Sequence, residues 1–332
     1  MAAIALSVVT TLYRSAPHLA EFLRRATAAA GRLTSDYEIV LVNDGSPDDS
    51  LALAIELQRR DSHVRVVDLS RNFGHHPAMM TGLRHARGDL VFLLDSDLEE
   101  PPEWLGEFHA RLVDSAADAV YGVQQKRRGG WFEKFTGWLF YTLVTEHLGP
   151  ALPRNTTTAR LMTRRFVDAL LQFPEREHTV AALCSITGFA QEPVPVQKAS
   201  SGRSTYSLAH RVGVLVSNVT SFSNRPLILV FYLGCVIVVV SGAAAAVLIW
   251  RRLVGGIGVP GYASLVVSVW LLGGLVIFCV GLVGIYLAKV FVEVKQRPPT
   301  IVRAEYPDHL PPTSSGDHDD RSSPLPARRT QP

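Results

Sequence analysis

The sequence predicts an α/β protein whose mostly parallel sheet carries helices on both faces, followed by two membrane-spanning helices. The first observation is a regular alternation of short apolar runs and helical patterns in the N-terminal half of the 332 residues. This alternation is typical of βαβ units. The second observation is a pair of long stretches without charged residues in the last third of the chain. Each exceeds the roughly 20 apolar residues that span the core of a bilayer.

The elements of the predicted sheet follow one another along the first 123 residues. Apolar runs bounded by turn residues predict strands, and apolar residues at helical spacing predict the helices between them. A helix between successive strands favours parallel pairing. Strands are expected at residues 4–10, 38–43, 64–68, 90–95 and 119–123, and helices at 17–30, 48–60, 77–87 and 102–115.

A different kind of helix is expected at about residues 131–149. Aromatic side chains crowd this stretch, and the basic run 126–128 precedes it. A basic and aromatic amphipathic helix is suited to the interface of a membrane. Packing against the core of the domain is the alternative interpretation, and both stay open.

The two uncharged stretches, residues 227–250 and 263–288, are predicted to form a transmembrane hairpin. A glycine-rich turn at 251–262 joins them, and a juxtamembrane helix at 207–226 precedes them. Basic residues are more frequent outside the hairpin than in its turn, so both ends are expected in the cytoplasm. The chain is therefore expected to be a multi-pass protein of the cell (inner or plasma) membrane. Residues 304–332, dominated by Asp, Ser and Pro, are expected to form a disordered cytoplasmic tail.

The composition argues against several other classes of protein. A net charge of +3 without a basic stripe gives no support for a nucleic-acid partner. Three cysteines, two of them within the predicted spans, indicate neither a disulfide framework nor a zinc cluster. The pair His75-His76 lacks a third ligand at zinc spacing. The first ten residues lack a charged region of the kind that opens a signal peptide, so none is expected there. Assembly is not fixed by the sequence, and a homo-oligomer is left open.

Acidic residues follow the apolar run 90–94 in the order Asp95-Ser96-Asp97-Leu98-Glu99-Glu100. They lie at the carboxyl end of a predicted strand, the edge where open α/β sheets bind ligands. Where a strand gives way to a turn, alternate carboxylates can converge on one cation, and such ligands suit Mg²⁺ or Mn²⁺. The alternative interpretation is that these acids only cap the next helix.

Two more strand ends carry polar residues. Asn43 and Asp44 close the second strand, where Asp44 and Gly45 form a turn or Asp44 accepts a hydrogen bond from a base or ribose. Arg71 follows the third strand and offers a cation to a phosphate. Further along, residues 198–207 are rich in serine with Arg203 at their centre, a composition typical of a flexible loop.

Taken together, these motifs resemble the family 2 glycosyltransferases. With the segment 220–227 leading into a two-span hairpin, the chain is more narrowly similar to the polyprenyl-phosphate glycosyltransferases, including bactoprenol glucosyltransferases and dolichol-phosphate mannose synthase. The similarity runs from about residue 4 to residue 297. It is carried by Ser7-Val8-Val9 with Tyr13, Val42-Asn43-Asp44-Gly45-Ser46, Arg71-Asn72-Phe73-Gly74, Asp95-Ser96-Asp97-Leu98, Pro101-Pro102-Glu103, Tyr121-Gly122 and Ala159-Arg160-Leu161-Met162.

The resemblance implies a GT-A (Rossmann-like) domain over residues 1–206 and inverting transfer of a sugar from a nucleotide-sugar donor. It implies a divalent metal, Mg²⁺ or Mn²⁺, and a polyisoprenyl phosphate acceptor such as undecaprenyl phosphate, for cell-envelope glycan synthesis or modification. By position, the nucleotide-sugar would contact Tyr13, Asn43, Asp44, Arg71 and Asp95, and the metal would be held by Asp97 and Glu99. The catalytic set would be Asp95, Asp97, Arg160 near the acceptor phosphate and Arg203 near the departing phosphates.

The chain departs from the family pattern at Thr11, Arg14-Ser15, Glu99, Gln124 and Thr158. Many relatives have aspartate where Thr158 stands. An acceptor phosphate is already largely anionic at neutral pH, so a base is dispensable in this interpretation. Two alternatives stay open. A processive polysaccharide synthase would show a Gln-x-x-Arg-Trp helix, which is absent from the sequence, and a non-catalytic scaffold is motivated by Thr158 and Arg14.

Overall fold

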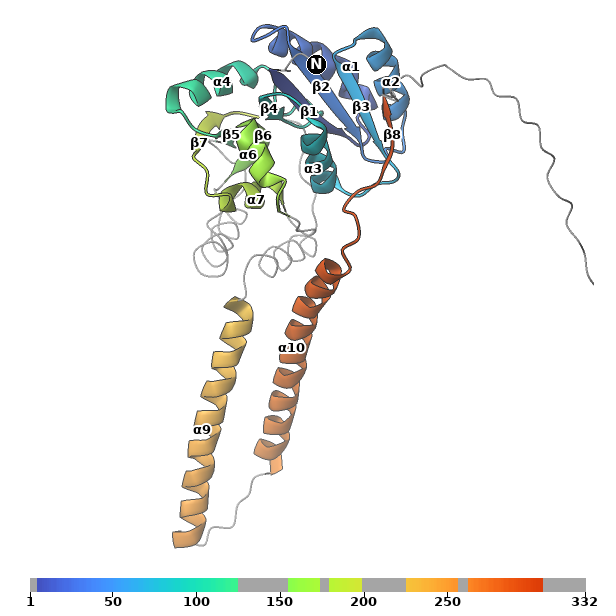
Figure 1. The fold of residues 1–332 in the computed structure, drawn as a ribbon. Coiled ribbons are helices and arrows are strands. Elements are labelled where there is room, and N and C mark those ends of the chain that lie inside the picture. The colour runs from blue at the N-terminus through green and yellow to red at the C-terminus, as the bar shows by residue number, and fades with distance from the viewer. Residues whose placement is uncertain (1–4, 125–154, 174–178, 199–224, 256–261, 307–332) are drawn as a thin grey trace, which may run out of the picture.

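The structure is a computed structural model that describes residues 5–124, 155–173, 179–198, 225–255 and 262–306. Figure 1 shows a mixed α/β domain with two long helices extending from one side of it. The strands are β1 (Leu6–Leu12), β2 (Tyr37–Asn43), β3 (Val64–Leu69), β4 (Leu90–Leu93), β5 (Ala119–Gln124), β6 (Thr156–Thr163), β7 (Gln191–Val196) and β8 (Val302–Tyr306). The helices are α1 (Ala16–Gly31), α2 (Ser50–Arg60), α3 (His75–His85), α4 (Trp104–Ser115), α6 (Arg164–Leu170), α7 (Val180–Ile186), α9 (Arg225–Gly255) and α10 (Tyr262–Val294).

The eight strands form one sheet in the order β7-β5-β6-β4-β1-β2-β3-β8. Parallel pairs join β1 to β2, β1 to β4, β2 to β3 and β5 to β7. Strand β6 runs antiparallel to both β4 and β5, and β8 runs antiparallel to β3. The sheet is therefore mixed rather than mostly parallel, because β6 and β8, which the prediction did not include, supply its antiparallel pairs.

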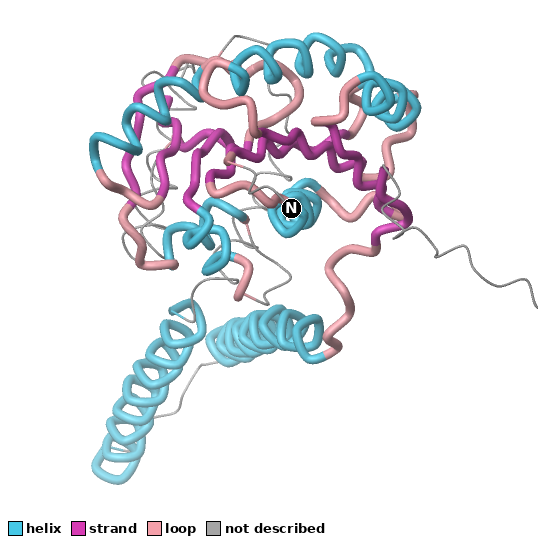
Figure 2. Tube along the Cα trace, turned by 45° about the horizontal axis from the view of Figure 1, so that its top comes forward, coloured by secondary structure: helices cyan, strands magenta, loops and turns pink. Residues whose placement is uncertain are grey.

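Helices cover both faces of the sheet, as predicted, and Figure 2 shows the strands between the two helical layers. On one face, Phe22 of α1 and Phe108 of α4 pack over Val8 and Phe92. On the other face, the side chains of α3, α6 and α7 pack over alternate residues of the same strands, including Val9. Successive residues of a strand point to opposite faces, so each central strand contributes to both cores.

The domain also includes a strand from the far end of the chain. Strand β8 comes after α10, yet it pairs with β3 at the edge of the sheet. Residues 1–206 are therefore not the whole of the sheet domain. The expectation of a disordered tail was wrong for residues 304–306, which lie in β8, whereas 307–332 lie outside the described residues.

The two predicted membrane spans fall within α9 and α10, which contact each other below the sheet domain (Figure 1). Within the described residues, one stretch, Leu272–Val294 of α10, is long and apolar enough to cross a membrane, with a mean hydropathy of 2.5. None of that stretch is buried within the protein. The predicted helix at 131–149 and residues 207–224 of the predicted juxtamembrane helix lie outside the described residues.

Candidate functional site

Those predicted site residues that the structure describes gather at one edge of the sheet. Strands β1, β2 and β4 are parallel, so their carboxyl ends lie at this edge. Leu93 of β4 pairs with Arg160 of the antiparallel strand β6. The residues that precede Arg160 therefore face those that follow Leu93. As a result, the first half of β6 meets the acidic turn 95–100.

Asp44 orders the loop that follows β3. Its buried carboxylate accepts hydrogen bonds from the backbone N–H of Phe73, at 2.7 Å to Oδ1, and of Gly74, at 3.0 Å to Oδ2. We call Asn43, Asp44 and the loop Arg71–Gly74 the β2–β3 wall. The sequence predicts that Asp44 contacts a nucleotide. In the structure its carboxylate also fixes the position of the loop in this wall.

A glycine allows the two parts of this wall to approach closely. Gly45 has a φ of +58°, and a Cβ atom there would lie 2.4 Å from backbone atoms of both Arg71 and Asn72. No other residue fits without displacing the loop. The exposed Arg71 guanidinium lies 4.1 Å from the centroid of the Phe73 ring. Arg71 is therefore held at the surface of the wall, where a phosphate can reach it.

Asn43 joins the ends of β2 and β3. Its Nδ2 donates to Asp68 Oδ1 at 2.8 Å, and its Oδ1 accepts from the Ser46 N–H at 3.3 Å. Both Asn43 and Asp68 are buried. The structure therefore uses the Asn43 amide inside the wall, although sequence analysis placed it among the residues that contact the nucleotide-sugar.

Tyr13 lies at the rim, with 48% of its surface exposed. The turn that carries it includes Arg14, whose φ of +56° is unusual for a side chain of this size. Ser15 stabilises the turn, because its Oγ accepts from the Tyr13 N–H at 3.1 Å and lies 3.0 Å from Ser96 Oγ. The turn after β1 and the turn after β4 are thus linked through two serine hydroxyls.

Asp95 forms an ion pair with His75, the first residue of α3. The distance from His75 Nε2 to Asp95 Oδ1 is 3.2 Å, and His75 Nδ1 lies 3.1 Å from Thr11 Oγ1. Burial opposes ionisation of Asp95, but His75 and the Thr158 hydroxyl together lower the pKa of its carboxyl. Burial likewise opposes the charge on His75, and Asp95 raises the pKa of the imidazole. Sequence analysis did not identify this partner, because 20 positions separate the two residues in the chain.

Asp97 and Glu99 lie on the turn beyond Asp95. Asp97 is exposed and its Oδ1 accepts a hydrogen bond from the Glu99 N–H at 2.9 Å. Although the residue is exposed, neighbouring groups partly desolvate its carboxyl, and this desolvation, followed by the charges of Asp95 and Glu99, raises the pKa of Asp97. Among the described residues, no group of three or more His, Cys, Asp or Glu side chains converges as a metal site. Two hard carboxylates fit a divalent cation whose remaining ligands come from donor phosphates.

Glu100 fastens the acidic turn to β6. It is fully buried, and its carboxylate accepts from the backbone N–H of Thr158 at 3.0 Å and of Ala159 at 2.7 Å. Lys198 Nζ lies 2.7 Å from Glu100 Oε1 and 3.9 Å from Glu99 Oε2. The sequence alone does not identify Glu100 or Lys198 as site residues, since the partners of both lie far away in the chain.

Arg160 borders a cavity of about 270 Å³ between β4, β6, α3 and α7. Its exposed fraction is 4%, and its Nε has no hydrogen-bond partner among the described residues. The cavity is lined by His76, Met79, Leu93, Thr156, Thr157, Thr158, Arg160, Thr179, Val180 and Ala181. A buried guanidinium among hydroxyl groups is suited to an anion.

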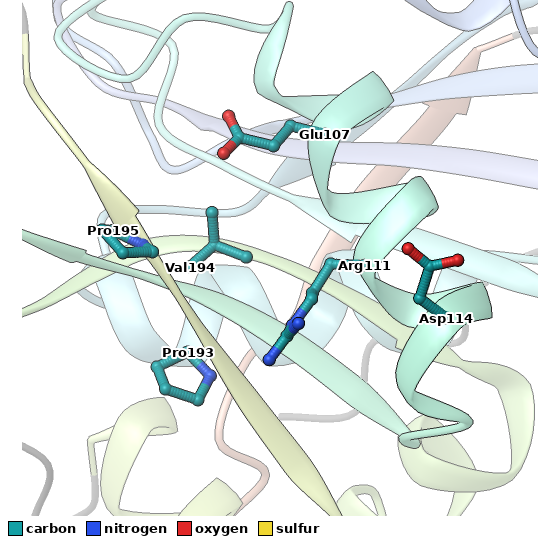
Figure 3. A pocket seen from close by; sticks show the side chains of 6 residues that line it. All are labelled: Glu107, Arg111, Asp114, Pro193, Val194 and Pro195. Carbon is teal, nitrogen blue, oxygen red and sulfur yellow. The ribbon is translucent and has the colours of Figure 1, made fainter.

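A larger hollow of about 460 Å³ lies elsewhere, between α4 and the edge strand β7. Figure 3 shows Glu107, Arg111 and Asp114 on one side of it and the stretch Pro193–Pro195 on the other. It holds none of the predicted site residues. We therefore assign the site to the smaller cavity and the acidic turn, where the chemistry-bearing residues converge. Arg203, the remaining predicted residue, lies outside the described residues.

The fold and the site together define a mixed α/β domain with an acidic turn and a buried arginine at one edge of its sheet. The family model described as "Glycosyl transferase family 2" matches residues 7–171. The chain is 52% identical over 305 residues to a protein of Mycobacterium tuberculosis (strain CDC 1551 / Oshkosh) named as a glycosyltransferase, covering 92% of this chain and 89% of that protein.

A second relative is the glycosyltransferase sll0501 of Synechocystis (strain ATCC 27184 / PCC 6803 / Kazusa), 35% identical over 89% of this chain and 93% of that protein. Among solved structures, the mannosyltransferase PcManGT from Pyrobaculum calidifontis is 17% identical and covers 87% of this chain and 86% of that one, with a TM-score of 0.48. The chain belongs to glycosyl transferase family 2. It is a glycosyltransferase with a mixed α/β fold.

Proposed function

We propose that the protein transfers a sugar, with inversion, from its nucleotide-sugar donor to a polyisoprenyl phosphate at the cytoplasmic face of a membrane. The observation that carries the proposal is Arg160, a buried guanidinium at a hydroxyl-lined cavity next to the acidic turn, whose Nε has no hydrogen-bond partner in the part of the chain that the structure describes. A site for a second anion beside the donor site suits an acceptor that is itself a phosphate. The apolar stretch Leu272–Val294 supports an acceptor that resides in a membrane.

In this proposal the donor lies along the β2–β3 wall and the acidic turn. Tyr13 and Asp44 border the nucleotide, Arg71 faces its phosphates, and Asp95 meets the ribose. Asp97 and Glu99 hold a divalent cation, which neutralises the charge of the leaving diphosphate when bound.

The acceptor phosphate lies against Arg160. A phosphate monoester has a second pKa near 6, so its attacking oxygen is largely anionic at neutral pH. Thr158 stands next to Asp95 and carries no titratable group, and no base is required. The chain's contribution is alignment of two anions and electrostatic stabilisation of the leaving group, with Arg203 as a further cation beside the phosphates.

The membrane part holds this site at the lipid surface. Both α9 and α10 are assigned as spans of a hairpin with its two ends in the cytoplasm, following the distribution of basic residues. The amphipathic helix expected at 131–149 adds a contact with the membrane interface in this proposal.

The test is a screen of labelled UDP-glucose, UDP-N-acetylglucosamine and GDP-mannose with undecaprenyl phosphate in vesicles. We expect one donor to give a labelled lipid that depends on Mg²⁺ or Mn²⁺. Label in a growing polymer would instead identify a processive synthase. Donor binding without transfer to any acceptor would identify a non-catalytic scaffold.

A further inference from the structure

Strand β8 attaches the end of the membrane part to the nucleotide side of the sheet. It begins at Val302, soon after α10 ends at Val294, and it pairs antiparallel with β3 from Leu69 to Val66. Figure 1 shows β8 alongside β3, at the edge of the domain reached by the chain from α10. Strand β3 leads directly into the loop Arg71–Gly74 of the β2–β3 wall. The returning chain therefore lies next to the root of that wall.

Arg303 of β8 binds the carboxyl end of β3 at two points. Its Nη1 lies 3.5 Å from Asp68 Oδ2, and its Nη2 donates to the carbonyl oxygen of Ser70. Asp68 is buried, and its other oxygen, Oδ1, accepts the hydrogen bond from Asn43. Arg303 thus supplies the charge that faces a buried carboxylate which itself holds the wall together.

The residues just before β8 contact the same region. The carbonyl oxygen of Ile301 accepts from the Ser70 N–H at 2.9 Å, and Thr300 Oγ1 lies 2.7 Å from Thr81 Oγ1 of α3. Ser70 is therefore held on both its N–H and its carbonyl oxygen by the returning chain. Because Ser70 immediately precedes Arg71, these bonds fix where the loop of the wall begins.

We propose that Arg303 is a positioning residue for donor binding: through Asp68 and Ser70 it holds the β2–β3 wall in the arrangement that accepts the nucleotide. The inference rests on the proposed placement of the donor at that wall. Arg303 contacts Asp68 and Ser70, which come before the loop Arg71–Gly74, so in this proposal it acts on the donor through the wall. Its loss therefore weakens donor binding while leaving the chemistry of bound donor unchanged.

The opposite end of β8 offers a matched control. Glu305 lies 3.2 Å from His85 Nε2 through Oε1 and 3.6 Å from Arg65 Nη2 through Oε2. These partners lie at the end of α3 and near the start of β3, away from the wall. A variant at Glu305 removes ionic contacts of the same strand without touching Asp68 or Ser70.

The experiment compares full-length Arg303→Ala, Arg303→Lys and Glu305→Gln with the wild type, all in nanodiscs. UDP-glucose, UDP-N-acetylglucosamine and GDP-mannose are titrated separately, and the tightest of them for the wild type is used for the variants. Donor Kd, donor KM, kcat at saturating donor and the unfolding temperature are measured. Asp44→Asn serves as the reference for the wall itself, because it weakens the two bonds that hold Phe73 and Gly74.

We expect Arg303→Ala to raise the donor Kd and KM by about threefold to tenfold with kcat nearly unchanged, as for loss of a charge-assisted contact. Arg303→Lys keeps the charge but not the two-point geometry, so its donor Kd lies between that of the wild type and that of Arg303→Ala. Glu305→Gln keeps the wild-type Kd. A wild-type Kd in Arg303→Ala, or an equal rise in Glu305→Gln, would overturn the inference. A wild-type Kd in Asp44→Asn would overturn the proposed donor site instead.

Discussion

The turn after β4 carries four carboxylates, and they differ in burial and in binding partners. They belong to Asp95, Asp97, Glu99 and Glu100. Glu100 is fully buried and is bound by Lys198 and by two backbone N–H groups of β6. Asp95 is paired with His75. Asp97 is exposed, but partial desolvation of its carboxyl and the nearby negative charges raise its pKa. Repulsion of this kind is relieved by a cation, so Asp97 is the member of the group best placed to bind one.

The first prediction at this scale concerns Asp97→Asn. The substitution removes a charged ligand but keeps the side-chain size, so turnover falls by about 100-fold or more while the fold is retained. The control variant is Asp49→Asn. Asp49 is exposed at the start of α2, so we expect this variant to keep full activity. Mn²⁺ binding, followed by electron paramagnetic resonance, weakens only in Asp97→Asn. Normal lipid glycosylation by that variant would contradict the metal assignment.

The second prediction concerns Thr158→Val. Valine keeps the branched shape, and the backbone N–H of residue 158 can still bind Glu100, so only the hydroxyl beside Asp95 is lost. We expect activity to fall by at most about tenfold, the effect of one hydrogen bond to a charged group. The rate in both proteins falls below about pH 6, as the acceptor phosphate becomes protonated. Abolished turnover in folded Thr158→Val would show that the hydroxyl takes part in the chemistry.

Single residues differ in how far the sequence alone reveals them. Asp44, Asp95 and Asp97 follow predicted strands directly, so local pattern was enough to place them at one edge. Lys198 and Glu100 form their pair across 98 positions, and Glu100 reaches Thr158 across 58. The contact with Thr158 depends on the antiparallel register of β6 beside β4, and Lys198 follows β7, which pairs with β5 in the same sheet. Without that register, no spacing in the sequence brings these residues together.

At the scale of elements, the junction of α1 and α2 depends on one carboxylate. Asp48 Oδ1 accepts from the hydroxyls of Ser46 at 2.5 Å and Ser50 at 2.6 Å, and Oδ2 accepts from the Ala16 N–H at 3.3 Å. Burial works against the charge, but the hydrogen bonds from Ser46 and Ser50 lower the pKa of Asp48 to about 2. The ionised form is therefore the one that the folded state binds most tightly.

The third prediction concerns the stability that Asp48 contributes to the folded state and how it depends on pH. Because the pKa of Asp48 is lower in the folded state than the usual 3.8, its stabilisation is complete above about pH 4 and is lost as the pH falls toward 2. The difference in unfolding temperature between wild type and Asp48→Asn is therefore constant near neutral pH and shrinks across that acidic range. The neighbouring variant Asp49→Asn shows no such convergence. A difference that stays constant down to pH 2 would contradict the role given to Asp48.

The ends of strands β1 to β5 and of helices α1 to α4 were predicted to within two residues, because each element has an uninterrupted apolar pattern. The other three strands have no such pattern. Strand β6 carries four threonines and the site arginine, and β7 contains Pro193 and Pro195, which suit an edge strand. Strand β8 alternates charged and apolar residues over only five positions. Its conformation comes from pairing with β3, which cannot be read from the five residues alone.

At the scale of the whole molecule, the chain leaves the sheet domain, passes through α9 and α10 and returns to the same sheet. The domain is thus attached to the proposed membrane hairpin at two places, before Arg225 and after Val294. The second attachment ends in a strand that pairs with β3. Removing everything after Ser223 therefore removes more than an anchor, because it uncovers the apolar edge of β3.

The last prediction separates the strand from the membrane part. In one variant the chain ends at Ser223, and in the other a long Gly/Ser linker replaces residues 225–298, so that residues 299–306 are kept. Because the second variant can restore β8 on β3, we expect donor Kd and solubility near those of the full-length protein, whereas the first binds donor weakly or aggregates. Both lose transfer to undecaprenyl phosphate in vesicles, since neither holds the site at the lipid surface. Equal donor binding by the two variants would show that β8 is dispensable for the nucleotide site. Undiminished transfer by the linker variant would show that the hairpin is not needed to reach the acceptor.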